Sequence, residues 1–229
     1  MSYTLKTCSS IATFFDREAP GWDAAHGPRS NRAADFAVRA SYLRKLCEVL
    51  GRPRVIDLGC GTGWQLIDLA DCIDGGVGLD IAPGMVGQAR ANAASVGADI
   101  SIAFHVGDSA TAKTENLGRF QLAMCVGSFE HMPDQGAALV AAARLLDAEG
   151  RFVVIMPHPC NPGILRSRWF GPRFEVPLNH LTPRGLTQLA RAVGLRLVAC
   201  EGMPYGGFGR LLHRWPLMAG AYAACFALA

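Results

Sequence analysis

The segment 55–64, Val-Ile-Asp-Leu-Gly-Cys-Gly-Thr-Gly-Trp, constrains the fold more than any other part of the chain. A short apolar run typical of a buried strand leads into three alternating glycines, and a helical pattern begins at Trp64. Glycines in such a turn let backbone N–H groups approach a ligand closely. An acid, Asp80, ends the next apolar run, where it is placed to accept hydrogen bonds from ribose hydroxyls. The pattern predicts a nucleotide-binding strand–turn–helix unit.

Strand and helix patterns alternate along most of the chain. We expect strands over 54–58, 76–80, 100–106, 120–126, 151–156 and 195–200 and in the apolar tail after residue 215, with helices over 31–50, 64–72, 83–97, 134–146 and 182–194. Regular alternation of this kind is typical of α/β proteins. We therefore predict a doubly wound, mostly parallel seven-stranded sheet.

Two segments fall outside this alternation. Residues 1–51 precede the first strand and are predicted to form an N-terminal helical cap, which leaves 52–229 as the main domain. Residues 157–181, rich in Pro, Arg and aromatic side chains, interrupt the last units after the fifth strand. Ligands of open α/β sheets bind beyond the carboxyl ends of the strands, where extra segments can cover them. We expect 157–181 to be a lid insertion.

Composition excludes several classes of protein. With 229 residues, half of them apolar, the chain is long enough for one globular domain. The 22 basic and 19 acidic side chains give a net charge of +3, far from the excess of a dedicated nucleic-acid binder. The eight cysteines form no C-x-x-C pair and no cluster with histidine at metal-ligand spacing, and no secretory signal is apparent. We expect a cytoplasmic protein that needs no metal and binds no nucleic acid.

The C-terminal third is basic and ends in an apolar tail. Residues 151–229 contain nine basic and two acidic side chains, which is consistent with a solvated face or with peripheral contact to an anionic membrane. The uncharged stretch 215–229 is too short to span a bilayer. It fits the last strand of a sheet better than an interfacial contact through Arg214 and Trp215.

The spacing of the glycines discriminates between nucleotide cofactors. A dinucleotide site has the pattern G-x-G-x-x-G, but the sixth position counted from Gly59 is Trp64. The bulky indole would obstruct the close strand–helix packing that a third glycine permits at this position. The sequence therefore disfavours a nicotinamide or flavin oxidoreductase.

Asp57-Leu-Gly59-Cys-Gly61-Thr-Gly63 resembles the first motif of class I S-adenosylmethionine-dependent methyltransferases. Three further segments agree with that family in order and spacing: Asp80-Ile81, Gly107-Asp108-Ser109, and 126–134 with its Glu-His-Met-Pro-Asp sequence. The resemblance covers about residues 52–200 and is strongest to the type-11 small-molecule group, which includes quinone-biosynthesis methyltransferases. It implies a Rossmann-like methyltransferase fold.

The resemblance also implies S-adenosylmethionine as cofactor and S-adenosylhomocysteine as product. The implied contacts are Gly59, Cys60, Gly61 and Gly63 along the methionine and ribose, Asp57 and the Val126 backbone at the ammonium, Asp80 at the ribose, Ile81 against adenine, and Asp108 beside Ser109 at the adenine amino group. Residues 36–43 resemble a segment from which quinone-type enzymes supply a cation to the methionine carboxylate, and this makes Arg39 a candidate. The alternative is an arginine on a helix surface in an ordinary ion pair.

Methyl transfer to a hydroxyl group requires a general base, and histidine is the natural residue. His131 follows the fourth strand and His180 precedes the helix at 182, so both are candidate catalytic residues. A structural role in a loop or lid is the alternative for each. Candidate substrate-binding residues are Trp22, His158, Trp169 and Arg173, of which the aromatic ones could instead pack a lid onto the domain.

These features together predict a methyltransferase that acts on a small-molecule acceptor. The leading hypothesis is O-methylation of a hydroxyl on an aromatic, quinone-like, polyketide-like or lipid-linked compound. Methyl transfer to carbon or nitrogen is the nearest alternative, since neither histidine would then be needed. A module that binds the cofactor without catalysis is a further alternative.

Overall fold

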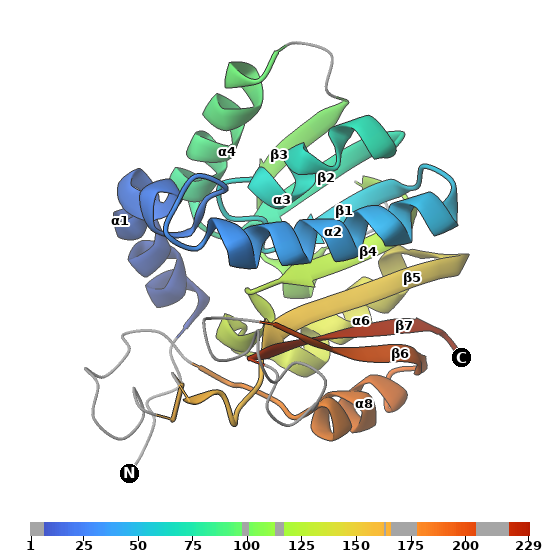
Figure 1. The fold of residues 1–229 in the computed structure, drawn as a ribbon. Helices are drawn as coiled ribbons and strands as arrows, with labels where there is room; N and C mark the ends of the chain where they lie inside the picture. Colours follow the sequence, from blue (N-terminus) through green and yellow to red (C-terminus); the bar gives the residue numbers. More distant parts are fainter. Residues whose placement is uncertain (1–6, 98–100, 113–116, 163, 166–177, 205–219) are drawn as a thin grey trace.

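A seven-stranded sheet is the centre of the molecule (Figure 1). The computed structural model describes residues 7–97, 101–112, 117–162, 164–165, 178–204 and 220–229. Its strands are β1 (Arg54–Leu58), β2 (Gly75–Asp80), β3 (Ile102–Val106), β4 (Phe120–Val126), β5 (Leu146–Pro157), β6 (Leu195–Met203) and β7 (Ala221–Leu228). They lie in the order β3-β2-β1-β4-β5-β7-β6; β1 to β5 pair in parallel, and β7 runs antiparallel to β5 and β6. The predicted fold class is confirmed.

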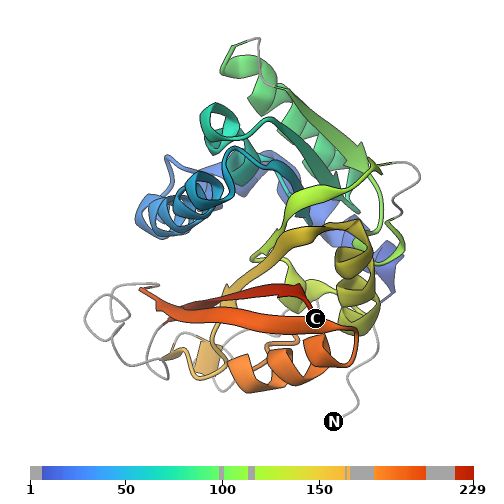
Figure 2. The same cartoon turned by 90° about the vertical axis from the view of Figure 1, so that its right-hand side faces the viewer.

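Helices cover both faces of this sheet (Figure 2). One core contains side chains of α2 (Ala33–Leu50), α3 (Trp64–Asp68) and α4 (Pro83–Ser95), and the other contains side chains of α6 (Gln135–Leu145) and α8 (Pro183–Arg191). Strand β5 shows why both layers form. Its Phe152 and Val154 belong to the second core and its Val153 and Ile155 to the first, as expected for a strand with two buried faces.

Helix α1 (Cys8–His26) stands apart from these layers and packs on α4. It begins at Thr7, whose hydroxyl oxygen accepts a hydrogen bond from the Ser10 N–H. A small apolar cluster joins the two helices and consists of Phe15, Ala19, Trp22, Ala82 and Met85. Within the predicted helical cap, residues 8–26 form α1 and residues 33–50 form α2.

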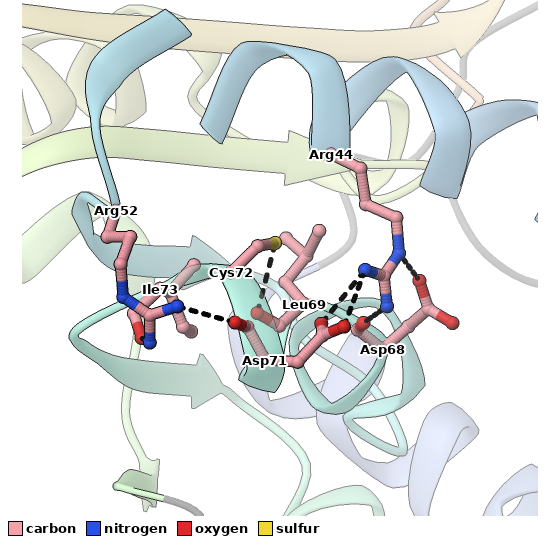
Figure 3. Close-up of polar contacts among 7 residues, drawn as sticks. All are labelled: Arg44, Arg52, Asp68, Leu69, Asp71, Cys72 and Ile73. Atoms are coloured by element: carbon pink, nitrogen blue, oxygen red, sulfur yellow. Dashed lines mark hydrogen bonds and ion pairs between the residues drawn. The ribbon is translucent and has the colours of Figure 1, made fainter. Parts of the chain in front are cut away.

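Arginine side chains fix α2 against the segment that follows β1 (Figure 3). The Arg44 guanidinium donates to Asp68 at 3.1 Å and to both carboxylate oxygens of Asp71 at 2.8 and 3.0 Å. Arg52, just beyond the end of α2, donates to the main-chain oxygens of Asp71 and Ile73 at 2.6 and 3.0 Å. These contacts set the position of α2, which carries Arg39.

Besides shifts of one to three residues at other element ends, the observed elements differ from the predicted ones at three places. Helix α3 ends at Asp68 and a separate 3₁₀ turn spans Ala70–Cys72, where one helix over 64–72 was predicted. Strand β5 begins at Leu146, because an irregularity in its pairing with β4 brings Leu146 opposite Phe120. In the tail, β7 starts at Ala221, and residues 215–219 lie outside the described part of the chain. Among the described helices, none has the length and apolar character that crossing a membrane requires.

Candidate active site

The turn after β1 favours glycine at three positions. Gly59, Gly61 and Gly63 have φ angles of +83°, +53° and +80°, in the left-handed region. A Cβ at position 59 would lie 2.6 Å from the Ser128 side chain, and one at position 63 would lie 2.7 Å from the Phe104 ring. The turn is therefore held tightly between the segment after β4 and the Phe104 ring of β3.

Asp80, at the end of β2, is bound directly to this turn. Its Oδ2 accepts the Gly61 N–H at 2.8 Å, and its Oδ1 accepts the Ala82 N–H at 2.9 Å. Burial raises the pKa of the carboxyl, and these two backbone hydrogen bonds oppose the rise. The carboxylate is thus fixed at the edge of the turn, where a ribose is expected.

Asp57 is a buried acid with an unused oxygen. The residue is 2% exposed, and its Oδ1 has no hydrogen-bond partner among the described residues. Burial, with the neighbouring Asp80 charge, raises the pKa of Asp57 to about 8. A buried carboxyl without a partner is costly, and a ligand cation such as an ammonium would satisfy it.

A cavity of about 690 Å³ opens beside the turn. Among the predicted cofactor residues, it is lined by Arg39, Gly59, Cys60, Gly61, Asp80, Ile81, Asp108, Ser109 and Val126. Asp57 and Gly63 are not part of the lining: Asp57 is buried, and Gly63 packs against Phe104. Gly63 therefore packs the turn against the inside of the protein.

Arg39 reaches the cavity from α2. Its Nη1 lies 3.7 Å from the position that a Cβ of Gly127 would occupy, just after β4. Its charge also lowers the pKa of Glu130, although burial has the larger effect and the pKa of Glu130 is raised overall. The arginine is therefore placed near the end of β4 and not on an open helix surface.

Two predicted catalytic histidines and Glu130 meet at the other side of the cavity. His131 and His180 both line it, and the Phe15 ring of α1 packs edge-on against His131 at 5.3 Å between ring centroids. Burial, reinforced by the neighbouring His131, lowers the pKa of His180 to about 4. Glu130 is 3% exposed, and its Oε2 has no hydrogen-bond partner among the described residues. The sequence prediction missed Glu130, although it precedes His131 directly in the recognised motif.

The predicted substrate-binding residues are separated in the structure. Trp22 lines the cavity, and its Nε1 is 4.0 Å from the position that a Cβ of Gly61 would occupy. His158 is not in the cavity lining: it is buried, its Nδ1 accepts the Cys160 N–H at 3.1 Å, and its ring packs edge-on against Tyr222. The turn after β5 folds this imidazole back onto β7, which argues against its predicted contact with substrate. Trp169 and Arg173 lie outside the described residues.

Three further lining residues were not predicted. The amide atoms of Gln65 and the Nε1 of Trp64 are buried without hydrogen-bond partners among the described residues. His26, to which the sequence assigned no role, stacks on Trp22 at 4.1 Å between ring centroids. Trp64 and Gln65 are the two residues after Gly63, at the start of α3. This position next to the glycine-rich turn was the sequence feature that could have predicted their place in the cavity wall. Nothing local in the sequence brings His26 to the same wall.

The charge pattern of the cavity fits S-adenosylmethionine. Asp80 and Asp108 can accept hydrogen bonds from hydroxyl and amino donors in the cavity, and Arg39 suits a carboxylate; Asp57, outside the lining, can act on a ligand ammonium only through a bridging group such as water. The glycines leave room for the backbone to approach the ligand. No group of three or more His, Cys, Asp or Glu side chains suited to a metal ion occurs within the part of the chain that the structure describes.

Comparison with known proteins also indicates a methyltransferase. Residues 55–150 match the family model of a methyltransferase domain. The chain is 27% identical over 213 residues to a ubiquinone biosynthesis O-methyltransferase of Xanthomonas euvesicatoria pv. vesicatoria (strain 85-10), covering 88% of this chain and 87% of that protein. The protein of the same description from Xylella fastidiosa (strain 9a5c) is 31% identical, over 58% of this chain and 53% of the relative.

Solved structures share the fold at low sequence identity. Magnesium protoporphyrin IX methyltransferase from Synechocystis PCC 6803 with bound S-adenosylhomocysteine aligns with a TM-score of 0.74 and 17% identity, over 97% of this chain and 99% of that one. A complex of the Haloferax volcanii Trm112 methyltransferase activator with a methyltransferase aligns with a TM-score of 0.73 and 19% identity, over 93% and 97%.

Fold and site together define a class I methyltransferase with a Rossmann-like domain. The chain is an S-adenosylmethionine-dependent enzyme that methylates a small molecule. The resemblance seen in the sequence motifs is thereby confirmed.

Proposed function

We propose that this enzyme methylates a hydroxyl oxygen of an aromatic, quinone-like compound. The observation that carries the proposal is the His131–His180 pair, which lies at the cavity wall beside the end of β4. A hydroxyl acceptor needs a base in this place, whereas a carbon or nitrogen acceptor does not require one. The relatives described as ubiquinone biosynthesis O-methyltransferases support the same acceptor class.

The acceptor side of the cavity is largely apolar. Its described lining includes Ile11, Phe14, Phe15, Phe36, Met132, Pro133, Ile155, Met156, Ile164 and Leu178. Such a wall favours a flat or hydrocarbon-bearing acceptor, which it shields from water. Helix α1 contributes Ile11, Phe14 and Phe15 to this wall.

We assign the chemical roles to the residues of the chain as follows. S-adenosylmethionine, when bound, supplies an electrophilic methyl group. Asp80, Asp108 and Arg39 hold the two ends of the cofactor site, while the apolar wall orients the acceptor. His131 accepts the hydroxyl proton, and His180, neutral at pH 7 because its pKa is about 4, orients the acceptor through a hydrogen bond.

The cap and the insertion complete this proposal. Helix α1 acts as the N-terminal cap over the cofactor site, whereas α2 belongs to a layer on the sheet. The segment 157–181 acts as the lid, and its residues 163 and 166–177 lie outside the described part. All eight cysteines are free thiols, which supports a role in a reducing compartment such as the cytoplasm. Membrane contact through Arg214 and Trp215 concerns residues that the structure does not describe.

A panel of phenolic, catecholic and quinol acceptors tests the proposal. We expect methyl ether formation by the wild type and a loss of at least about 100-fold in kcat for His131→Ala on the best acceptor. His105→Ala, an exposed histidine of β3, is the matched control and should retain full activity. Full activity of both His131→Ala and His180→Ala on a hydroxyl acceptor would refute the base assignment, and a product methylated on carbon or nitrogen would favour the alternative reaction.

A further inference from the structure

Helix α1 extends along the cofactor cavity from end to end. At its start, the Cys8 thiol donates to Asp108 Oδ2 at 3.5 Å, which is the predicted adenine end. Near its end, Trp22 approaches Gly61, and the charge of Arg39 acts on His26. One helix therefore forms a wall for the whole cofactor.

A closed network of hydrogen bonds joins α1 to the glycine-rich turn. The Asp23 carboxylate of α1 accepts the Thr62 hydroxyl at 2.6 Å with one oxygen and the Asn92 amide at 2.8 Å with the other. The same Asn92 amide also donates to the Thr62 main-chain oxygen at 3.0 Å. Thr62 and Asn92 are only 5% and 7% exposed, so the network is well shielded from water.

The position of Thr62 gives this network its importance. The residue lies between Gly61 and Gly63, both in the left-handed region and both free to adopt many other conformations. Thr62 contacts Asp23 of α1 and Asn92 of α4. These contacts, in addition to the backbone hydrogen bonds of the turn, connect this part of the turn to both helices. A turn ordered before the ligand arrives binds it more tightly, because less conformational entropy is lost on binding.

A second carboxylate of α1 makes a comparable contact that avoids the turn. Asp16 Oδ1 accepts the Gly84 N–H at 2.6 Å, in the first turn of α4. Asp16 and Asp23 thus both hold α1 on its neighbours, but only Asp23 contacts the glycine-rich turn. Substitutions of Asp16 and Asp23 can therefore distinguish the docking of α1 from the ordering of the glycine-rich turn.

We propose that Asp23 is a positioning residue for cofactor binding: its carboxylate holds Thr62, and hence the glycine-rich turn, in the ligand-binding conformation while it seats α1 over the cofactor. Because Phe15 of the same helix packs against His131, this seating also places one wall of the acceptor site. That last step rests on the proposed function, whereas the effect on the cofactor does not.

Calorimetric titration with S-adenosylhomocysteine tests the proposal without any acceptor. We expect Asp23→Ala to raise the dissociation constant at least about 10-fold, since a hydrogen bond to a charged group is lost and the turn must be ordered on binding. Asp16→Ala should change it by less than about twofold. The charge of Asp16 raises the pKa of Asp80. Its removal in Asp16→Ala therefore favours the ionised Asp80 carboxylate, which is the form competent to bind.

Thr62 provides a second pair of variants that keeps the test decisive if Asp23→Ala does not fold. Thr62→Val removes the hydroxyl donor at nearly constant volume and should weaken binding about as much as Asp23→Ala, whereas Thr62→Ser retains the donor and should restore binding. In turnover, the KM for S-adenosylmethionine should rise while kcat at saturation changes little. If Asp23 and Thr62 only stabilised the fold, these substitutions would lower the melting temperature without raising KM selectively over kcat.

Two results would overturn the proposal. One is wild-type affinity for S-adenosylhomocysteine in folded Asp23→Ala or Thr62→Val. The other is equal weakening by Asp16→Ala, which would assign the effect to helix docking alone. Failure of the wild type to methylate any hydroxyl acceptor would instead count against the proposed function, because the cofactor titrations do not depend on it.

Discussion

His180 lies close enough to His131 in the cavity wall for this neighbour to act on it, and burial together with His131 lowers the pKa of His180 to about 4. The ordinary pKa of histidine is about 6.5, so the folded protein disfavours the proton that the unfolded chain accepts. The His180 contribution to stability is therefore constant above about pH 6.5 and is lost as the pH falls from there towards 4.

Replacement of His180 by Gln tests this linkage. We expect the wild type to lose on the order of 1 kcal/mol of unfolding free energy through this group between pH 7 and pH 5, a figure already reduced for partial exposure. His180→Gln should lose correspondingly less over the same interval. Urea unfolding of both proteins at the two pH values measures the difference, and identical pH dependence would contradict the lowered pKa.

Binding of S-adenosylhomocysteine should release a proton from Asp57. Its pKa of about 8 leaves the carboxyl mostly protonated at pH 7, and the ligand ammonium favours the ionised form. Affinity should therefore increase as the pH rises towards 8. Calorimetry at pH 7 in buffers of different ionisation enthalpy should show about one proton released in the wild type and none in Asp57→Asn. Heats that are independent of the buffer would contradict this account.

The raised pKa of Asp57 makes the ligand-free protein less stable as the pH rises, although it makes ligand affinity increase. A carboxyl whose pKa is raised in the folded state stabilises that state at low pH, and this contribution is lost as the pH rises from about 4 through 8. Asp57→Asn should remove this loss, which thermal unfolding of the ligand-free protein at pH 6 and pH 8 would detect. Saturating S-adenosylhomocysteine should likewise restore stability at pH 8 in the wild type.

Asp80→Ala should abolish detectable binding of S-adenosylhomocysteine, with a loss of at least about 100-fold. The substitution removes the expected ribose acceptor and frees the Gly61 N–H that Asp80 now holds. Asp74→Ala, an exposed acid in the loop before β2, is the matched control and should bind normally. NADH should bind neither protein. Binding of NADH by a wild type that fails to bind S-adenosylhomocysteine would contradict the whole site assignment.

Gln65→Leu should stabilise the free protein by about 1 kcal/mol. Both amide atoms of Gln65 are buried without a hydrogen-bond partner in the described structure, and an apolar side chain of similar size removes that cost. Chemical denaturation without ligand measures the gain. Gln88→Leu on α4 is the contrasting variant, since its amide donates to Asn92 and its loss should give no stabilisation. A destabilised Gln65→Leu would show that the amide is satisfied in solution.

The sequence predicted those parts of the fold that depend on local patterns. Strands β1 and β4 have the predicted bounds, because each is an apolar run with clear turn signals beyond its end. Asp134 caps α6 through the Ala137 N–H, as an acid before an Ala-rich helix should. The start of β5 at Leu146 was not predictable in this way, since it depends on pairing with β4.

The site was predictable only in its recognised motifs. Asp80 and Asp108 follow strands whose ends meet at one edge of the sheet, so their sequence position indicates their place in the cavity. His26 and Asp23 reach the same site from α1. Asp23 contacts Thr62 and Asn92, which lie 39 and 69 positions further along the chain. His26 stacks on Trp22 of the same helix. For His158, the direction of the side chain depends on the turn after β5, which no local periodicity specifies.

The place of β7 between β5 and β6 has a consequence for synthesis of the protein. In the described structure, β6 reaches the sheet through β7 alone, although it is made earlier. While the ribosome is still adding residues 204–220, β6 lacks the strand through which it joins the sheet. The cofactor half of the sheet, β1 to β4, can assemble during this interval, so the nascent chain should acquire its nucleotide-binding turn before β6 and β7 join the sheet.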